Sequence, residues 1–183
     1  DLSSSTGKIL RLTETGGVPS DNPFVSQSGV EPEIFSYGHR NAQAVVYDSQ
    51  SNRIYTHEHG PRGGDELNLM RPGVNYGWPA ITYGIDYSGA KISPYTSLPG
   101  MEQPLTYWDP SIAPSGMTLY QGDMFPEWQG DLFMTSLRFK NVYQIDMQDG
   151  KPSAQQTLFE DINERLRDIR TAPDGSLYIL AEG

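Results

Sequence analysis

The amino-acid sequence predicts an all-β protein made of short strands and tight turns. Its 183 residues include 19 glycines and 14 prolines, a content that favours turns over helices. Runs of strand-forming residues recur along the chain, and turn signals separate them. The length suits one domain, and no apolar run approaches the roughly 20 residues that a membrane-spanning helix needs.

A strand–turn–strand unit recurs, which indicates a repeat architecture. The first unit is a hairpin of residues 43–48 and 53–58, joined by a turn at 49–52. The later units comprise residues 115–120, 131–137 and 141–146, and then residues 167–172 and 176–180. Four-stranded units that recur at roughly 40–50 residues are typical of a β-propeller, which needs about four to eight blades to close. We therefore expect residues 1–183 to form a single partial β-propeller domain of about three blades.

Three further segments complete the expected layout. Residues 7–12 alternate in polarity and predict a strand. Residues 62–110 are rich in Gly, Pro and Tyr, and we interpret them as a long insertion without regular structure, a feature that is usually functional. Residues 161–167 are expected to form a loop or a single turn that leads into a strand.

The charge of the chain excludes some classes of partner. The formal net charge is −10, so the basic face that a nucleic acid requires is missing, and an anionic membrane surface is disfavoured for the same reason. There is no cysteine, which excludes disulfides and thiolate sites.

The segment Glu58-His59-Gly60-Pro61-Arg62-Gly63-Gly64-Asp65-Glu66-Leu67-Asn68 has the densest chemistry in the chain. Its glycines allow the backbone to approach a ligand closely, and Asp65 and Glu66 offer oxygen atoms to a hard cation such as calcium. The alternative is that both carboxylates are solvated loop charges. His57 and His59 should face one side of a strand, but zinc is not expected because no third nitrogen or sulfur ligand is near in sequence.

Basic residues recur where predicted strands meet loops, namely at Arg40, Arg138, Lys140, Arg165 and Arg167. In a propeller, loops at one end of successive blades converge, so these groups would bind a small polyanion that carries carboxylates or phosphates. The alternative is that they form surface salt bridges with the 23 acidic residues. His39 is interpreted as a partner of loop backbone, and Trp78 either packs or stacks on a sugar or cofactor ring.

Three motifs carry a resemblance to a known family. They are Gly38-His39-Arg40-Asn41, the segment 58–68, and Asn75-Tyr76-Gly77-Trp78-Pro79. With their order and spacing, the chain resembles the soluble pyrroloquinoline-quinone (PQQ)-dependent aldose sugar dehydrogenases of the glucose/sorbosone dehydrogenase family over nearly its whole length. The resemblance implies a six-bladed β-propeller with PQQ and Ca²⁺ at the channel mouth, of which this chain would be the C-terminal half.

The resemblance also implies roles for individual residues. Arg40 and Asn41 would be catalytic and would contact the quinone. The other cofactor-binding residues would be His59, Arg138, Arg165 and Arg167, which lie beside the ion or the carboxylates of PQQ. The carbonyl oxygens of Gly60 and Pro61 would bind the calcium ion that holds PQQ, while Glu66, Asp65 and the Tyr76 carbonyl would form a second, structural calcium site.

The chain departs from the family pattern at two points. The family usually continues Arg-Asn with Pro-Gln-Gly, where this chain has Ala42-Gln43-Ala44. The family's general base is a histidine of the other half, whose place none of the three histidines here takes. Losing it would cost roughly 10²–10⁴-fold in rate.

The implied activity is PQQ- and calcium-dependent oxidation of the C1 hydroxyl of an aldose sugar to a lactone, with the fragment alone inactive. The alternative is a non-catalytic propeller-type binding or assembly module. The resemblance further implies a periplasmic or secreted protein, and a homodimer would close the propeller.

Overall fold

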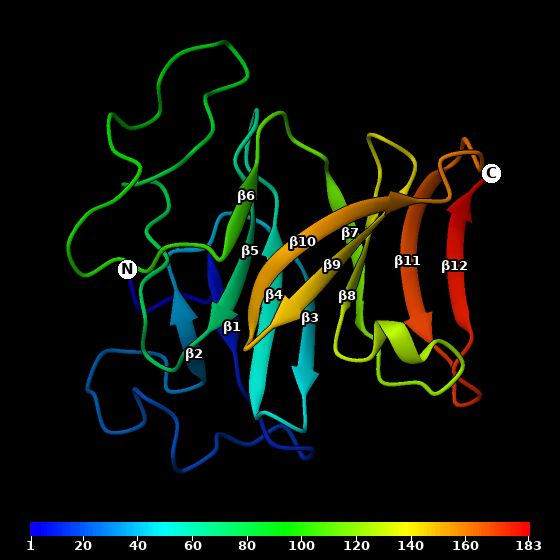
Figure 1. Cartoon of the computed structure of the whole chain (residues 1–183). Coiled ribbons are helices and arrows are strands. Elements are labelled where there is room, and N and C mark those ends of the chain that lie inside the picture. The colour runs from blue at the N-terminus through cyan, green and yellow to red at the C-terminus, as the bar shows by residue number, and fades with distance from the viewer.

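The computed structural model describes all 183 residues and confirms the all-β class (Figure 1). Two four-stranded sheets form the middle of the molecule. The first contains β3 (Ala42–Asp48), β4 (Arg53–Glu58), β5 (Asp65–Met70) and β6 (Thr106–Trp108). The second contains β7 (Pro114–Leu119), β8 (Leu132–Ser136), β9 (Val142–Gln148) and β10 (Lys151–Leu158).

Each four-stranded sheet is an antiparallel meander in which the strands pair in chain order. Two-stranded sheets flank them: β1 (Lys8–Leu10) with β2 (Ile34–Tyr37), and β11 (Arg165–Thr171) with β12 (Leu177–Glu182). A short 3₁₀ helix, Pro126–Trp128, lies in the β7–β8 connection, and no helix is long and apolar enough to cross a membrane. The chain thus contains repeated propeller-like sheets, but not a closed ring.

The first strands of successive sheets, β3, β7 and β11, run side by side in the same direction. At one end His59 Nε2 lies 2.6 Å from the carbonyl oxygen of Pro114, and the Ser115 hydroxyl donates to the Leu166 carbonyl at 2.6 Å. At the other end the Gln121 amide donates to Asp48 at 3.1 Å. The arrows of β3 and β11 point the same way in Figure 1. The segments at the end where these strands begin therefore share one edge, which we call the rim: residues 38–41, 59–64, 109–113, 137–141 and 159–165.

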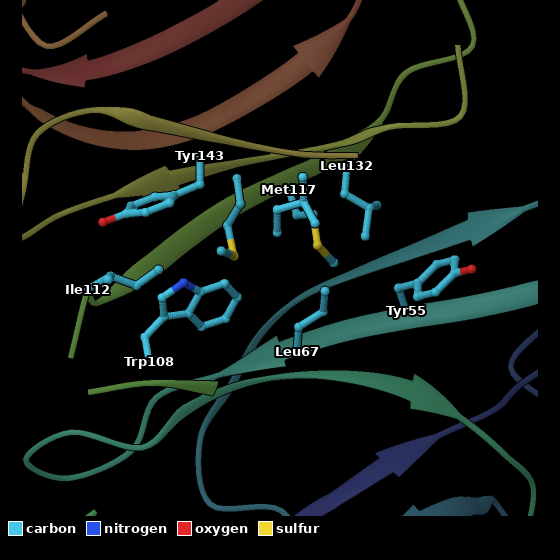
Figure 2. Close-up of a cluster of buried hydrophobic side chains, with 9 residues drawn as sticks. Tyr55, Leu67, Trp108, Ile112, Met117, Leu132 and Tyr143 are labelled. Carbon is cyan, nitrogen blue, oxygen red and sulfur yellow. The ribbon is translucent and has the colours of Figure 1, made fainter. Parts of the chain in front are cut away.

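Apolar side chains between the sheets hold the strands in this arrangement. Tyr55, Leu67 and Trp108 of the first four-stranded sheet pack on a set from the second sheet and the segment that precedes it (Figure 2): Ile112, Met117, Leu132, Met134, Tyr143 and Ile145. A smaller cluster joins β7–β9 to β11: Tyr120, Phe133, Val142, Leu166 and Ile169. Burial of this surface is the main driving force for the association of the sheets.

Close backbone approach also shapes the contact between β7 and β11. A Cβ atom on Gly116 would lie 2.7 Å from the amide nitrogen of Ile169, and closer still to Asp168. Only glycine fits at this point, because any side chain would separate the two strands.

Residues 62–110 differ from the expectation. They contain β5 and β6, which supply the third and fourth strands of the first four-stranded sheet, so the insertion without regular structure is confined to residues 71–105. The reason is that β5 forms a hairpin with β4, with Glu58 opposite Glu66, and the ladder of backbone hydrogen bonds does not require an alternating apolar pattern. Residues 161–164 form the expected loop, and β11 begins at Arg165.

Candidate functional site

The turn at residues 38–41 positions Arg40 at the rim, between β2 and β3. Gly38 adopts φ +77°, and a Cβ atom there would lie 2.6 Å from the amide nitrogen of Gly77, so glycine permits the turn to pack against residues 75–78. The Arg40 guanidinium donates to the His59 carbonyl at 3.0 Å and lies 5.4 Å from the centre of the Trp78 ring. This half-buried guanidinium is held by two contacts and keeps most of its N–H donors free.

Asn41 lies beside Arg40 with its side chain exposed. Its carbonyl accepts from the His59 amide at 3.0 Å, and its Oδ1 accepts from the Gln43 side chain at 2.9 Å. The backbone of Asn41 is therefore fixed against the 59–64 turn, while the side chain remains accessible at the rim.

The 59–64 turn presents unpaired carbonyl groups. Gly60 and Pro61 are buried, and no hydrogen bond of the structure ends on either carbonyl oxygen. The Gly60 amide donates to Asp65 at 2.8 Å, and a Cβ atom at Gly60 would lie 2.5 Å from the carbonyl group of Gly64. Carbonyl oxygens without donors are the ligands that Ca²⁺ prefers, so the turn suits a hard cation.

A small cavity lies between this turn and the segment of residues 76–82. Glu58, Glu66 and Tyr76 line it together with Arg40, and its volume of about 10 Å³ has room for roughly one water-sized sphere. Asn68 donates to both glutamates at 3.3 Å, while its own Oδ1 is buried without a partner. The carbonyl oxygen of Tyr76 likewise accepts no hydrogen bond.

The electrostatics of the cavity favour a cation. Glu58 and Glu66 lie directly opposite each other on β4 and β5. Burial, and then the charge of Glu58, raises the pKa of Glu66 to about 8. Such a carboxyl group holds a proton near neutral pH unless a cation replaces it. Because no group of three or more His, Asp or Glu side chains is arranged to hold a metal, a cation here would also need the neutral oxygen atoms.

Asp65 is placed differently from Glu66. Its Oδ1 accepts from the Gly60 amide, and its Oδ2 accepts from the Ser111 hydroxyl and from the amides of Ile112 and Ala113, at 2.6–2.8 Å. Ala113 has φ +51°, a conformation that L side chains adopt at a cost. The buried carboxylate therefore ties the 59–64 turn to the 109–113 segment and orders the rim between the two four-stranded sheets.

Of the remaining basic residues, Arg138, Lys140 and Arg165 belong to the rim segments, whereas Arg167 lies further along β11, outside them. Arg138 donates to the Ser111 carbonyl at 2.9 Å, and Lys140 donates to the Asn163 carbonyl at 2.9 Å. Arg165 and Arg167 share Glu182, at 3.5 and 2.7 Å. All four have side chains that are at least partly exposed, so the salt-bridge alternative describes only the last two in this structure.

Sequence reasoning missed two residues of the site. Glu58 was seen only as part of a motif, yet its buried carboxylate contacts the turn that carries Arg40. The expectation for His39 was wrong: its ring lies 2.8 Å from the Ser36 hydroxyl and 3.2 Å from Glu58, and it stacks on Tyr76. The hairpin that β4 and β5 form around Arg62 places Glu58 opposite Glu66, and two like charges that face each other need a compensating partner.

His57 leads to a prediction about stability. Its side chain is fully buried on β4, both ring nitrogens lack partners, and burial lowers its pKa from 6.5 to about 3. Between these values the unfolded chain binds a proton that the folded chain does not, so stability is present above pH 6.5 and is lost as the pH falls towards 3.

Replacing His57 with leucine should remove this loss, which amounts to about 1.4 kcal/mol for each pH unit below the unfolded pKa. Urea unfolding of both proteins at pH 7, 5 and 4 measures the difference, because all other titrating groups are shared. Parallel pH profiles for the two proteins would contradict the assignment.

Comparisons with known proteins show the family of the chain. The sequence profile of the Glucose / Sorbosone dehydrogenase family matches residues 1–183. The chain belongs to the glucose/sorbosone dehydrogenase family. It is 46% identical over 184 residues to an aldose sugar dehydrogenase of Escherichia coli, covering 100% of this chain and 50% of that relative.

Solved structures of this dehydrogenase family superpose on the chain. The apo form of the soluble aldose sugar dehydrogenase from Escherichia coli matches with a TM-score of 0.95 and 45% identity, covering 100% of this chain and 53% of that one. The PQQ-bound form of an aldose sugar dehydrogenase from Streptomyces coelicolor matches with a TM-score of 0.73 and 31% identity, covering 99% and 47%. The chain therefore spans about half the length of these relatives.

Proposed function

We propose that this chain is the cofactor- and calcium-binding part of a PQQ-dependent dehydrogenase that oxidises the C1 hydroxyl of an aldose sugar to a lactone. The observation that carries the proposal is the fixed guanidinium of Arg40 beside the unpaired carbonyl groups of Gly60 and Pro61. When bound, PQQ supplies a quinone that accepts the hydride from the sugar, and Ca²⁺ polarises the quinone carbonyl as a Lewis acid.

The residues of the rim fit these two groups. The carbonyl oxygens of Gly60 and Pro61 would ligate the calcium ion, with His59 beside it. The contact between His59 Nε2 and the Pro114 carbonyl leaves Nδ1 as the free ring nitrogen of the neutral imidazole. Arg40 and Asn41 would take the catalytic positions, where Arg40 stabilises negative charge that develops on the acceptor.

The carboxylates of PQQ would be held by Arg138, Arg165 and Arg167. One N–H group of Arg138 donates to the Ser111 carbonyl, and the other N–H groups of its guanidinium are free to bind a carboxylate. Arg165 and Arg167 would exchange their shared partner Glu182 for the cofactor, which costs little because exposed ion pairs are weak. Arg138 and Arg165 in the rim, with Arg167 two residues along β11, would supply the positive charge that a trianion needs.

We propose that the cavity beside Glu66 holds a second, structural calcium ion. Glu66 and the Tyr76 carbonyl would be its ligands, because the Tyr76 carbonyl oxygen and Glu66 Oε1 accept no hydrogen bond and are therefore available to a cation. Asp65 stays a predicted ligand, although direct ligation would have to replace one of the four hydrogen bonds that it accepts.

Replacing Glu66 with glutamine should remove most of the thermal stabilisation that calcium gives. Calcium at a hundredfold excess over its dissociation constant adds about 2.7 kcal/mol to the wild type. In chelator the variant should be at least as stable as the wild type, because it no longer places a buried carboxyl group opposite Glu58. Glu127→Gln on the exposed 3₁₀ helix is the matched control. An equal calcium effect in the Glu66 variant would remove Glu66 from the ligand set.

The affinity of the chain for PQQ, measured by fluorescence titration once in calcium and once in chelator, tests the proposed function. We expect calcium-dependent binding. We expect no aldose oxidation by the chain alone, because His39 and His57 are buried and His59 faces the proposed cofactor. A longer protein that contains the chain should oxidise aldoses with an artificial electron acceptor. Absence of PQQ binding by the folded chain in calcium would favour the non-catalytic module instead.

The open sheet edges support a proposal about assembly. β12 pairs only with β11, and β1 pairs only with β2, while Tyr178 and Leu180 on β12 are 67% and 60% exposed. Exposed strand edges invite pairing. We propose that further sheets cover them and complete a six-bladed ring, as a homodimer would; a monomer at every concentration in light scattering would exclude the dimer. A periplasmic or secreted location is part of the same proposal, and cell fractionation tests it.

A further inference from the structure

Glu58 has an unusual place among the carboxylates of the rim. It is the last residue of β4, only 4% exposed, and no arginine or lysine neutralises it. Its Oε2 accepts from the backbone amides of Arg40 at 2.6 Å and Asn41 at 3.2 Å. Its Oε1 lies 3.2 Å from His39 Nδ1 and 3.3 Å from Asn68 Nδ2. One buried carboxylate thus collects four hydrogen bonds.

The 38–41 turn forms backbone hydrogen bonds through the Gly38 carbonyl, the His39 amide and the Asn41 carbonyl, but none through the amides of Arg40 and Asn41. Arg40 and Asn41 precede β3, so the first ladder partners of that strand lie beyond them, and their two amides would be unpaired without Glu58. A buried N–H group without an acceptor is costly, and a carboxylate that accepts two backbone amides is a strong acceptor for both. The Glu58 side chain is therefore the acceptor that fixes these two amides of the turn.

A second layer fixes Glu58 itself. Because a carboxylate can only accept, His39 must carry a proton on Nδ1, and in the neutral ring Nε2 then accepts from the Ser36 hydroxyl at 2.8 Å. The His39 ring stacks on Tyr76 at 4.7 Å between centroids. Ser36 and His39 are 0% and 3% exposed, so this chain of contacts is rigid and dry and offers no nucleophile to solvent.

The far end of Arg40 is anchored too. Its guanidinium donates to the carbonyl of His59, the residue that follows Glu58, and lies over the Trp78 ring. Backbone and side chain of Arg40 are thus both attached to the β4 terminus. We propose that Glu58 is a positioning residue, whose buried carboxylate holds the 38–41 turn so that Arg40 and Asn41 meet the cofactor in a preset geometry. The inference rests on the proposed function for the identity of the cofactor, but not for the order of the turn.

The test replaces Glu58 with glutamine, which keeps the shape but offers one oxygen acceptor and turns an NH₂ group towards a donor. In the cofactor-free protein, hydrogen exchange at the amides of Arg40 and Asn41 should accelerate about tenfold to a hundredfold, the usual effect of losing a charge-assisted hydrogen bond. Exchange at Tyr55 in the middle of β4 should not change. PQQ affinity, measured by fluorescence in calcium, should fall by about tenfold or more.

Glu127→Gln on the 3₁₀ helix is the control and should leave both measurements unchanged. Glu58→Asp is the second variant, to be used if the glutamine variant does not fold. It keeps the negative charge, but its side chain is one methylene shorter, so the carboxylate lies further from the two amides and their hydrogen exchange should still accelerate. In the wild type, the Arg40 amide proton should appear downfield, as a short bond to a carboxylate demands.

Unchanged hydrogen exchange at the Arg40 and Asn41 amides in both folded variants overturns the inference. If the wild type binds PQQ, an unchanged PQQ affinity in the variants overturns it as well. If the wild type does not bind PQQ, the proposed function fails, while the exchange measurement still decides the positioning role. The two failures are therefore distinguishable.

Discussion

Replacing Arg40 with alanine is expected to weaken PQQ binding by roughly 30- to 150-fold, the equivalent of about 2–3 kcal/mol for a lost charged hydrogen bond. The guanidinium lies beside the Gly60–Pro61 turn, and its contacts with His59 and Trp78 hold it in one orientation. Ligand binding therefore loses little side-chain conformational entropy at Arg40. Fluorescence titration in calcium measures the affinity. In a longer, active protein the same substitution should reduce turnover further, because Arg40 would stabilise developing charge.

Two controls frame this result. Arg40→Lys should recover only part of the affinity, because an ammonium group is a point charge that cannot form two parallel hydrogen bonds. Arg11→Ala removes an exposed arginine that pairs with Asp21 at 2.9 Å, and should leave PQQ binding unchanged. The free energy of unfolding of Arg40→Ala should fall by less than about 1 kcal/mol, because only one hydrogen bond of a half-buried side chain is lost. Wild-type affinity in the Arg40→Ala protein would exclude Arg40 from the cofactor site.

Replacing Asp65 with alanine is expected to lower the free energy of unfolding by about 3–5 kcal/mol, the largest stability effect that we predict. The substitution leaves donors without an acceptor on both sides of the sheet contact, namely the amides of Gly60 and Ile112 and the Ser111 hydroxyl. The Ala113 amide keeps a second acceptor, Ser111 Oγ at 3.3 Å. Each buried donor that loses its acceptor costs about 1–3 kcal/mol. Urea unfolding measures the loss.

The same experiment separates two roles of Asp65. If the carboxylate acts through hydrogen bonds, the loss should be equally large in calcium and in chelator. If it acts as a calcium ligand, the loss should appear only in calcium. We expect the first result. Asp174→Ala removes an exposed turn carboxylate that contacts only Ser176, and should cost less than about 1 kcal/mol.

The fold was predictable where local patterns decide it. The β3–β4 hairpin follows from two strand-forming runs, residues 43–48 and 53–58, and a polar turn at residues 49–52, and both strands appear in the structure. By contrast, β10 has a mostly exposed, polar sequence, Lys151–Leu158, that resembles a loop. It becomes a strand because β9 offers an open edge with unpaired backbone groups, and this cause lies outside the segment itself.

The site was predictable to the extent that its residues are adjacent in motifs. Arg40, Gly60 and Glu66 are expected at the quinone, at the first calcium ion and at the second calcium site, and in the structure all three line one small cavity. The link between Glu58 and His39 joins residues 19 positions apart through side chains, and such polar pairings leave no periodic signal in a sequence. The donors that surround Asp65 come from a segment 46–48 residues further along, so its hydrogen-bonding role was equally hidden.

The parallel course of β3, β7 and β11 separates two tasks within each repeat. Hydrophobic contacts join the strands to one another, whereas most of the residues proposed to bind the cofactor lie at or beside the rim segments. Libraries that vary the exposed residues 138–139 or 159–164 should therefore change ligand preference without unfolding the protein. The 38–41 and 59–64 turns should tolerate far less variation, because each donates hydrogen bonds to a buried carboxylate, Glu58 and Asp65 respectively.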